Sequence, residues 1–295
     1  MKRRLLLTGA TGFLGYNFLQ QNLLAWEVIA ATHQRPFSFS AINTVILNLA
    51  DTNNIEHVFA TIQPEAVVHL AAIADTNFCE NNETLAEQIN VNATVTLAKL
   101  CKAAAIPFLF TSTDLVFDGT KGNYAETDMT NPLNIYGKQK ITAEKNVLEI
   151  YEAACVLRMP LMFGNGGAYA QSFMQPFLAK LKQGETLSLF TNEYRSAVGG
   201  NSAAKGILHA LNNQWKGLYH LGAKEKLSRY EFGALLCETL GINKNLIAPA
   251  LQADVKMAAP RPPDVSLNSD KAFLQGYKPL SVSAALAQLA KQYKL

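Results

Sequence analysis

Short apolar segments alternate with longer amphipathic segments through the first half of the chain. Short, bounded apolar runs are typical of strands that are buried on both faces of a sheet. The predicted strands cover residues 4–8, 27–32, 44–49, 66–71, 107–112 and 154–159. Between them, apolar residues recur at helical spacing. This pattern predicts helices over residues 13–24, 53–62, 85–104 and 136–151.

Strands that alternate with helices form βαβ units, in which the strands lie parallel and helices cover both faces of the sheet. We therefore predict an α/β fold, with a Rossmann-type doubly wound parallel sheet over residues 1–163. After Gly164 the alternation ends, and segments rich in glycine and proline interrupt the pattern. This change predicts a smaller, interrupted substrate-binding lobe over residues 164–295, with strands returning to the main sheet from about residues 194–222.

The composition argues against several classes of protein. The chain has 295 residues, of which 49% are hydrophobic and 17% charged, and its net charge is +3. This charge is small and the lysines of the chain are scattered, which argues against nucleic acid as a partner. No apolar stretch approaches the about 18 residues that span a membrane, and the apolar run at residues 5–7 is too short for a signal peptide. We expect a cytoplasmic protein without a membrane partner.

The cysteines give no support for a metal site or a disulfide framework. They are widely spaced and form no CxxC pair: Cys79, Cys101, Cys155 and Cys237. Such a pattern is typical of reduced thiols in a cytoplasmic protein. We therefore expect no bound metal.

A glycine-rich segment, "TGATGFLG", joins the first predicted strand to the first predicted helix. Gly9, Gly12 and Gly15 follow a GxxGxxG spacing. Glycine permits a tight turn and a close approach of backbone to a diphosphate, and the helix N-terminus offers free N–H groups to it. Glycines also serve ordinary turns, but the position after a strand and before a helix favours dinucleotide binding.

The second predicted strand lacks the acid that NAD-binding folds place near its end. Between Glu27 and Asp51 there is no acidic residue, and His33 and Arg35 stand in this region instead. A guanidinium group can pair with the 2′-phosphate of NADP, which a carboxylate would repel. The sequence therefore favours NADP bound by Arg35. NAD stays possible, because Arg35 could also be a solvated loop residue.

Tyr136 and Lys140 lie four residues apart in a predicted helix, so their side chains share one face. Asn134 is a candidate cap for the start of this helix. A nearby ammonium group lowers the pKa of a phenol from its usual value of about 10. The strand "FLFTSTD" ends at Thr113, where its hydroxyl can hold a substrate oxygen, with Ser112 as the alternative hydroxyl.

Six motifs together resemble a known family. They are, in chain order, "TGATGFLG", "VVHLAA", "INVNAT", "TSTDLVFDG", "NPLNIYGKQK" and "RPPDVSLN". Their order and spacing resemble the extended short-chain dehydrogenases/reductases, and within them the dTDP-4-dehydrorhamnose reductase branch, over nearly the whole chain. The resemblance implies that Thr113, Tyr136 and Lys140 form the catalytic set.

The resemblance also implies contacts with the cofactor and the substrate. Asn48 and Leu49 match the residues beside the adenine, and Arg261 matches an arginine that helps to hold a nucleotide-sugar; Arg261 could equally be a loop residue between stiffening prolines. The full set expected to bind NADP, from the residues and the resemblance together, is Gly9, Thr11, Gly12, Phe13, Leu14, Gly15, Arg35, Asn48, Leu49, Ala71, Ala72, Asn90, Tyr136 and Lys140.

These observations predict an oxidoreductase that reduces a carbonyl, most simply that of a 4-keto nucleotide-sugar. Hydride would come from the nicotinamide cofactor, and Tyr136 would donate the proton. Dehydration is disfavoured, because Leu115 follows Asp114 where related dehydratases have an Asp-Glu pair. Leu161 and Ser202 depart from the reductase pattern, so the identity of the sugar and nucleotide stays open.

Two other functions stay open. A nucleotide-sugar epimerase would use a similar site. A regulatory subunit that binds the cofactor without turnover is a different class, and the regulatory subunit of methionine adenosyltransferase belongs to the same branch. A homodimer through the predicted helices at residues 85–104 and 136–151 is also possible.

Overall fold

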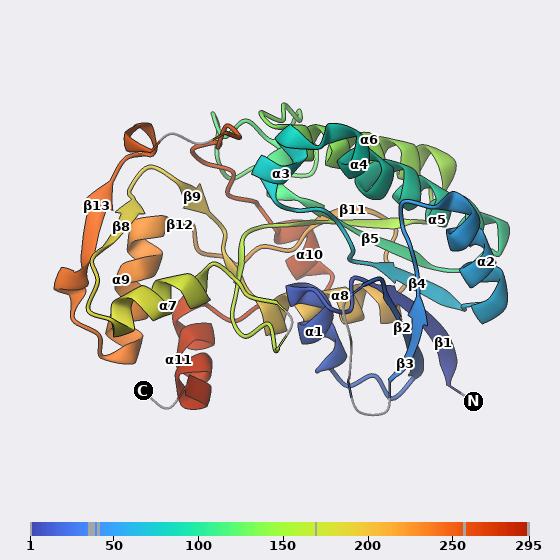
Figure 1. Cartoon of the computed structure of the whole chain (residues 1–295), viewed down its shortest axis with the longest axis horizontal. Helices are drawn as coiled ribbons and strands as arrows, with labels where there is room; N and C mark the ends of the chain where they lie inside the picture. Colours follow the sequence, from blue (N-terminus) through green and yellow to red (C-terminus); the bar gives the residue numbers. More distant parts are fainter. Residues whose placement is uncertain (1, 35–38, 40–41, 169, 256–257, 294–295) are drawn as a thin grey trace.

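The computed structural model describes residues 2–34, 39, 42–168, 170–255 and 258–293, and its largest element is a seven-stranded sheet (Figure 1). The strand order is β11-β6-β5-β4-β1-β2-β3, and every neighbouring pair is parallel. The strands are β1 (Arg3–Thr8), β2 (Trp26–Thr32), β3 (Asn43–Ile46), β4 (Ala66–His69), β5 (Phe108–Thr113), β6 (Cys155–Met159) and β11 (Gly217–His220). The predicted Rossmann-type doubly wound sheet is confirmed.

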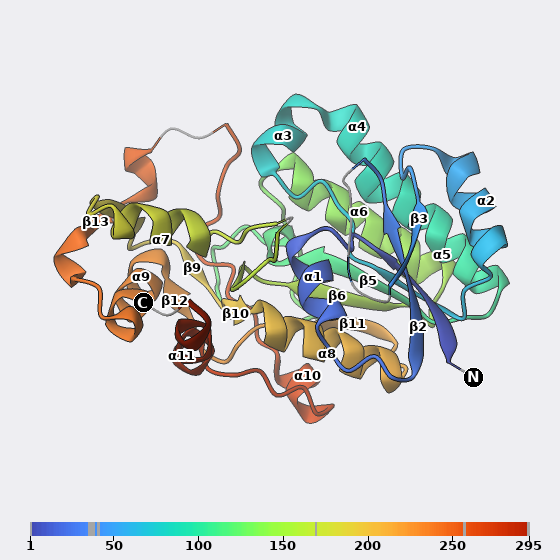
Figure 2. The ribbon, with the colours of Figure 1, turned by 60° about the horizontal axis from the view of Figure 1, so that its bottom comes forward.

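Helices cover both faces of this sheet because successive side chains of each strand point to opposite sides. Leu5 and Leu7 pack into the core beneath α1 (Phe13–Leu19) and α8 (Gly200–Asn212), which lie side by side in Figure 2. Leu6 packs into the other core. The helices on that second face are α2 (Thr52–Ile62), α5 (Ala93–Ala103) and α6 (Ile135–Ile150).

The strand order reverses between β1 and β4, so the loops that follow these strands diverge and leave a crevice at their carboxyl ends. The segment that follows β4 in the chain carries α3 (Thr76–Asn81) and α4 (Glu83–Glu87). The helix predicted over residues 85–104 is interrupted, because a π-helical turn, η1 (Gln88–Asn92), separates α4 from α5. The predicted helix over residues 13–24 ends earlier, at Leu19.

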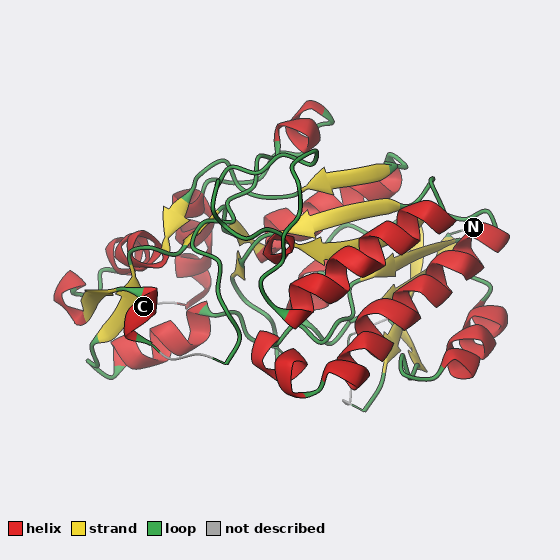
Figure 3. Ribbon diagram, turned by 90° about the horizontal axis from the view of Figure 1, so that it is seen from above, coloured by secondary structure: helices red, strands yellow, loops and turns green. Residues whose placement is uncertain are grey.

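The second lobe is built from short helices and strands (Figure 3). These elements pack around their own core of aromatic and aliphatic side chains. Phe163 and Phe232 meet edge to face there, with ring centroids 5.0 Å apart. Its helices are α7 (Met174–Lys182), α9 (Arg229–Leu240), α11 (Val282–Tyr293) and the short η3 (Lys244–Leu246) and η4 (Gln252–Asp254). Its paired strands are β8 (Leu187–Phe190) with β13 (Ile247–Ala250), β7 (Met162–Phe163) with β10 (Val198–Gly199), and β9 (Tyr194–Arg195) with β12 (Leu227–Ser228).

The chain returns to the main sheet after β6, as β11 pairs with β6 in parallel and Tyr219 lies opposite Leu157. Residues 194–222 were predicted to return strands to the main sheet. Of the strands in this region, β9 and β10 pair instead with short strands of the second lobe. Two further short elements are η2 (Asp114–Val116) and α10 (Asp270–Leu274). Among the helices that the structure describes, none is long and apolar enough to cross a membrane.

Candidate active-site cleft

The three positions between β1 and α1 that carry glycine differ in what a larger residue would meet there. Gly9 has φ +74°, and a Cβ there would lie 2.6 Å from the backbone nitrogen of Ala71. A Cβ on Gly15 would lie 2.1 Å from the carbonyl oxygen of Gly9. Packing therefore requires both glycines. A Cβ on Gly12 would meet only the Gly9 oxygen, at 3.2 Å, so Gly12 borders open space where a phosphate group could approach.

A chain of buried hydrogen bonds lies beneath this loop. The backbone N–H of Ala71 donates to Thr8 Oγ1 (3.3 Å), which donates to His69 Nδ1 (2.6 Å). Thr94 Oγ1 donates to the carbonyl oxygen of Asn90 (2.9 Å), so it accepts from His69 Nε2 (3.0 Å). This order leaves His69 neutral with its proton on Nε2, in agreement with burial, which lowers its pKa to about 3.

Asn90 connects the segment after β4 to α6. Its Oδ1 accepts from the backbone N–H of Ile73 (2.9 Å), and its Nδ2 donates to the carbonyl oxygen of Ile73 (3.1 Å) and to Gln139 Oε1 (2.9 Å). Gln139 directly precedes Lys140 in α6. Asn90, which was predicted to bind the cofactor, therefore joins the segment after β4 to α6.

Thr113 and Tyr136 line one cleft of about 330 Å³ at the carboxyl ends of β5 and β6. Both side chains are buried. Asn134 caps α6, since its Oδ1 accepts from the backbone N–H of Gly137 (2.8 Å), and this confirms the predicted cap. The cap fixes the first turn of the helix and with it the position of the phenol.

The ionisation of the tyrosine–lysine pair differs from the expectation. Burial, followed by the charge of Asp114, raises the pKa of Tyr136. The prediction of a lowered phenol pKa is therefore wrong for the protein's own groups, because desolvation dominates. Burial also lowers the pKa of Lys140 to about 7, although the Glu144 carboxylate opposes this shift. The Lys140 ammonium lies 4.1 Å from the ring centroid of Phe110.

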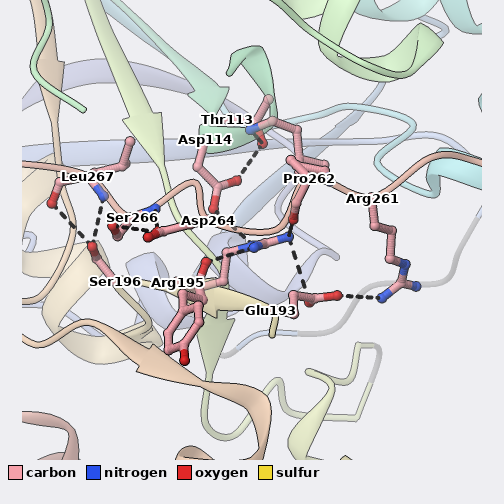
Figure 4. Close-up of polar contacts among 12 residues, drawn as sticks. Thr113, Asp114, Glu193, Arg195, Ser196, Arg261, Pro262, Asp264, Ser266 and Leu267 are labelled. Atoms are coloured by element: carbon pink, nitrogen blue, oxygen red, sulfur yellow. Dashed lines mark hydrogen bonds and ion pairs between the residues drawn. The ribbon is translucent and has the colours of Figure 1, made fainter. Parts of the chain in front are cut away.

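The same cleft is lined by three arginines around one carboxylate, Glu193. Figure 4 shows two of them, Arg195 and Arg261, beside Glu193. Glu193 Oε1 lies 2.8 Å from Arg229 Nε and 3.7 Å from Arg195 Nη2, and its Oε2 lies 3.7 Å from Arg261 Nη1. Burial alone would raise the pKa of Glu193, but the Arg195 and Arg229 guanidinium groups outweigh it and hold that pKa below its usual range. This part of the cleft therefore carries a positive excess.

Sequence reasoning anticipated only Arg261 of this arginine cluster. Glu193 and Arg195 stand two residues apart in "NEYRSAV", which in an extended segment places their side chains on the same side. That spacing of opposite charges within an otherwise uncharged stretch was the available signal. Arg229 begins α9 and gave no comparable signal.

The residues predicted at the adenine end follow the strands β2 and β3. Arg35 lies outside the described residues, and His33 is exposed. Asn48 is half-buried, and its Oδ1 accepts from the backbone N–H of Ala50 (3.1 Å). Leu49 packs against the core beside α2. The contacts of these residues with a cofactor stay predictions.

The sheet topology and the glycine turn place the chain in the class of Rossmann-type doubly wound α/β folds. Residues 3–295 match the model of the RmlD substrate binding domain, and the chain belongs to that family.

Individual relatives differ in their described roles. Methionine adenosyltransferase 2 subunit beta of Danio rerio is 30% identical over 285 residues, which cover 93% of this chain and 85% of the relative. The probable low-salt glycan biosynthesis reductase Agl14 of Haloferax volcanii is 29% identical over 260 residues, with 87% and 86% covered. The structure of dTDP-4-dehydrorhamnose reductase from Bacillus anthracis in complex with NADP superimposes with a TM-score of 0.88 at 22% identity, over 99% of this chain and 100% of that one.

Proposed function

We propose that the protein reduces the carbonyl group of a 4-keto nucleotide-sugar, with NADPH as the hydride donor and Tyr136 as the proton donor. The observation that carries this proposal is the shared cleft, which Thr113 and Tyr136 line together with the arginine cluster around Glu193. The relationship to reductases of nucleotide-sugar and glycan pathways supports the same reaction class.

The turn between β1 and α1 fits the diphosphate of a dinucleotide. Gly9 and Gly15 bring backbone close to backbone, and Gly12 borders the open space that a side chain would fill. Thr11 and Phe13 flank that opening and are half-buried. The bound NADP in the Bacillus anthracis reductase supports this choice of cofactor. Bound NADPH would supply the hydride.

Thr113 and Tyr136, which line the cleft, and Lys140, which is buried in α6, have complementary tasks. Thr113 holds the carbonyl oxygen by a hydrogen bond, and Tyr136 donates its proton to that oxygen as it gains charge. The raised phenol pKa keeps Tyr136 protonated and therefore able to donate. The pKa of Lys140 is near 7, so a fraction of its side chains carries a positive charge at neutral pH. Lys140 would bind the ribose of the cofactor.

The arginine cluster suits a diphosphate on the substrate. Three guanidinium groups face one buried carboxylate, so an added dianion finds excess positive charge. Arg229 Nη1 is buried and has no hydrogen-bond partner among the described residues. Arg261 is exposed, with 37% of its side chain accessible, and can reach a ligand. An unpaired buried donor favours a ligand that accepts from it.

The test measures NADPH consumption with a panel of nucleotide-sugars and simple ketones. Tyr136→Phe is expected to lower kcat/KM by about 10²- to 10⁴-fold, since it removes the proton donor alone. Tyr151→Phe is the matched control, because the Tyr151 hydroxyl donates to the carbonyl oxygen of Ile106 (3.1 Å), away from the cleft. Equal activity of Tyr136→Phe and wild type would refute the assigned role.

A regulatory protein without turnover is the second candidate. The 30% identity to methionine adenosyltransferase 2 subunit beta over most of both chains favours it. Binding of NADPH, followed by fluorescence, together with no NADPH consumption on any carbonyl compound would support this alternative against the reductase. The homodimer and the cytoplasmic location stay predictions.

A further inference from the structure

Asp114 is a buried carboxyl group inside the cleft that the proposed reaction does not use. Its side chain lies between Thr113 and Arg195, as Figure 4 shows. Oδ1 accepts a hydrogen bond from Thr113 Oγ1 (3.1 Å), and Oδ2 lies 3.7 Å from Arg195 Nε. Oδ2 is buried and has no hydrogen-bond partner among the described residues. A carboxyl group in this position controls what its neighbour can donate.

The hydroxyl of Thr113 has one proton to give. Its oxygen already accepts from the backbone N–H of Leu115 (3.2 Å). When Asp114 is ionised, the Thr113 proton points to the carboxylate, so Thr113 can only accept from a ligand. When Asp114 is protonated, its O–H can donate to the Thr113 oxygen, and the Thr113 proton is free to point into the cleft.

We propose that Asp114 is a positioning residue whose protonation sets the direction of the Thr113 hydroxyl. The carboxylic acid makes Thr113 a donor, which suits a substrate carbonyl, and the carboxylate makes Thr113 an acceptor, which suits a substrate hydroxyl. This inference rests on the proposed reductase function and names the group that selects between carbonyl reduction and the reverse oxidation of the alcohol.

Charges from several elements face this carboxyl group. Arg195 from β9 favours the carboxylate, whereas Glu193 beside it disfavours the carboxylate, and the Tyr136 phenol faces Asp114 from α6. Burial is the largest influence and raises the pKa of Asp114 to about 6. Both states are therefore populated near neutrality. Carbonyl reduction should fall as the pH rises through this pKa, and alcohol oxidation should fall as the pH decreases through it.

Asp114→Asn tests the inference, because an amide stays neutral and its Nδ2 can still donate to Thr113. For wild type, kcat/KM for reduction is expected to fall about tenfold per pH unit above pH 6, as for loss of one proton. For Asp114→Asn the fall that begins near pH 6 is expected to disappear, which leaves only a fall that begins near pH 7, where Lys140 loses its charge. An unchanged decline in Asp114→Asn would overturn the inference. Asp118→Asn, which changes a carboxyl group outside the cleft lining, is the matched control.

A second measurement does not need turnover. The ¹³C signal of the Asp114 carboxyl group, assigned by its loss in Asp114→Asn, is titrated in wild type and in Thr113→Val. The Thr113 hydrogen bond stabilises the carboxylate, so the midpoint should rise in Thr113→Val and stay in Thr113→Ser. A midpoint that does not move in Thr113→Val overturns the inference. If wild type consumes no NADPH, the proposed function fails, while this titration still decides whether the two groups are coupled.

Discussion

A substitution at Glu144 would test the buried ion pair behind the tyrosine–lysine pair. Glu144 in α6 and Arg158 in β6 each expose only 3% of the side chain. Arg158 Nε donates to both carboxylate oxygens (3.0 and 3.2 Å), and Nη2 donates to Oε2 (2.7 Å). Glu144→Gln preserves the shape of the side chain but leaves the guanidinium group buried without its counter-charge.

The size of the effect follows from that burial. Removing one partner of a buried pair costs about 3–5 kcal/mol. An unfolding entropy of about 2.1 cal/mol/K per residue gives about 0.6 kcal/mol/K for 295 residues, so the Tm should fall by about 5–8 °C. The same change removes the carboxylate that raises the pKa of Lys140, so that pKa should fall below about 7.

Urea unfolding followed by tryptophan fluorescence measures the loss, since Trp26 and Trp215 are both buried. Glu149→Gln is the matched control, because Glu149 is exposed on the same helix and should change stability by no more than about 0.5 kcal/mol. If Glu144→Gln and Glu149→Gln unfold at the same urea concentration, the reasoning from burial is refuted.

The remaining predictions concern the glycine turn, a helix cap and two histidines. Gly15→Ala should lower the free energy of unfolding by about 1–3 kcal/mol because its Cβ meets backbone. Gly12→Ala should change stability by less than about 1 kcal/mol but weaken NADPH binding, measured by fluorescence titration; equal effects of the two variants would contradict the assigned roles. Ser228→Ala should cost about 1 kcal/mol in urea unfolding, because Ser228 forms the capping box of α9. Burial lowers the pKa values of His69 and His220 to about 3. Between pH 6.5 and 3 the unfolded chain therefore binds protons that the folded chain does not, so His220→Gln should flatten the loss of urea stability on acidification.

The alternation of apolar runs and helical segments was sufficient to predict the main sheet. The inner runs, at β4, β5 and β6, are buried on both faces, so their apolar side chains have no other place in a folded chain, whereas the edge strand β3 is largely exposed. The same pattern does not predict the π-helical turn at residues 88–92, because one extra residue per turn hardly changes the spacing of apolar residues. The role of the π-helical turn is seen in the structure, where Asn90 in this turn bonds to Ile73 and to Gln139 and so joins the segment after β4 to α6.

The candidate site was predicted in part. Tyr136 and Thr113 were found because helix spacing and strand ends are local properties of the sequence, and both line the cleft. Of the arginines around Glu193, Arg261 was predicted, but Arg229 was missed because its contact with Glu193 joins segments 36 residues apart in the chain. Arg195 was missed although it stands only two residues from Glu193. The direction of the Tyr136 pKa shift was also missed, since burial is decided by the whole fold.

The edge strand β11 comes from the second half of the chain but completes the main sheet, so the two halves of the chain are not independent folding units. A chain that ends after Phe163 would lack both β11 and α8, which would leave β6 as an open edge and uncover the apolar side chains that α8 covers beside α1. Such a fragment is expected to aggregate. Exchange of the second half with that of a relative would likewise replace part of the scaffold under the proposed hydride-transfer site. New substrate preferences are therefore better sought by changes within the cleft than by recombining whole halves.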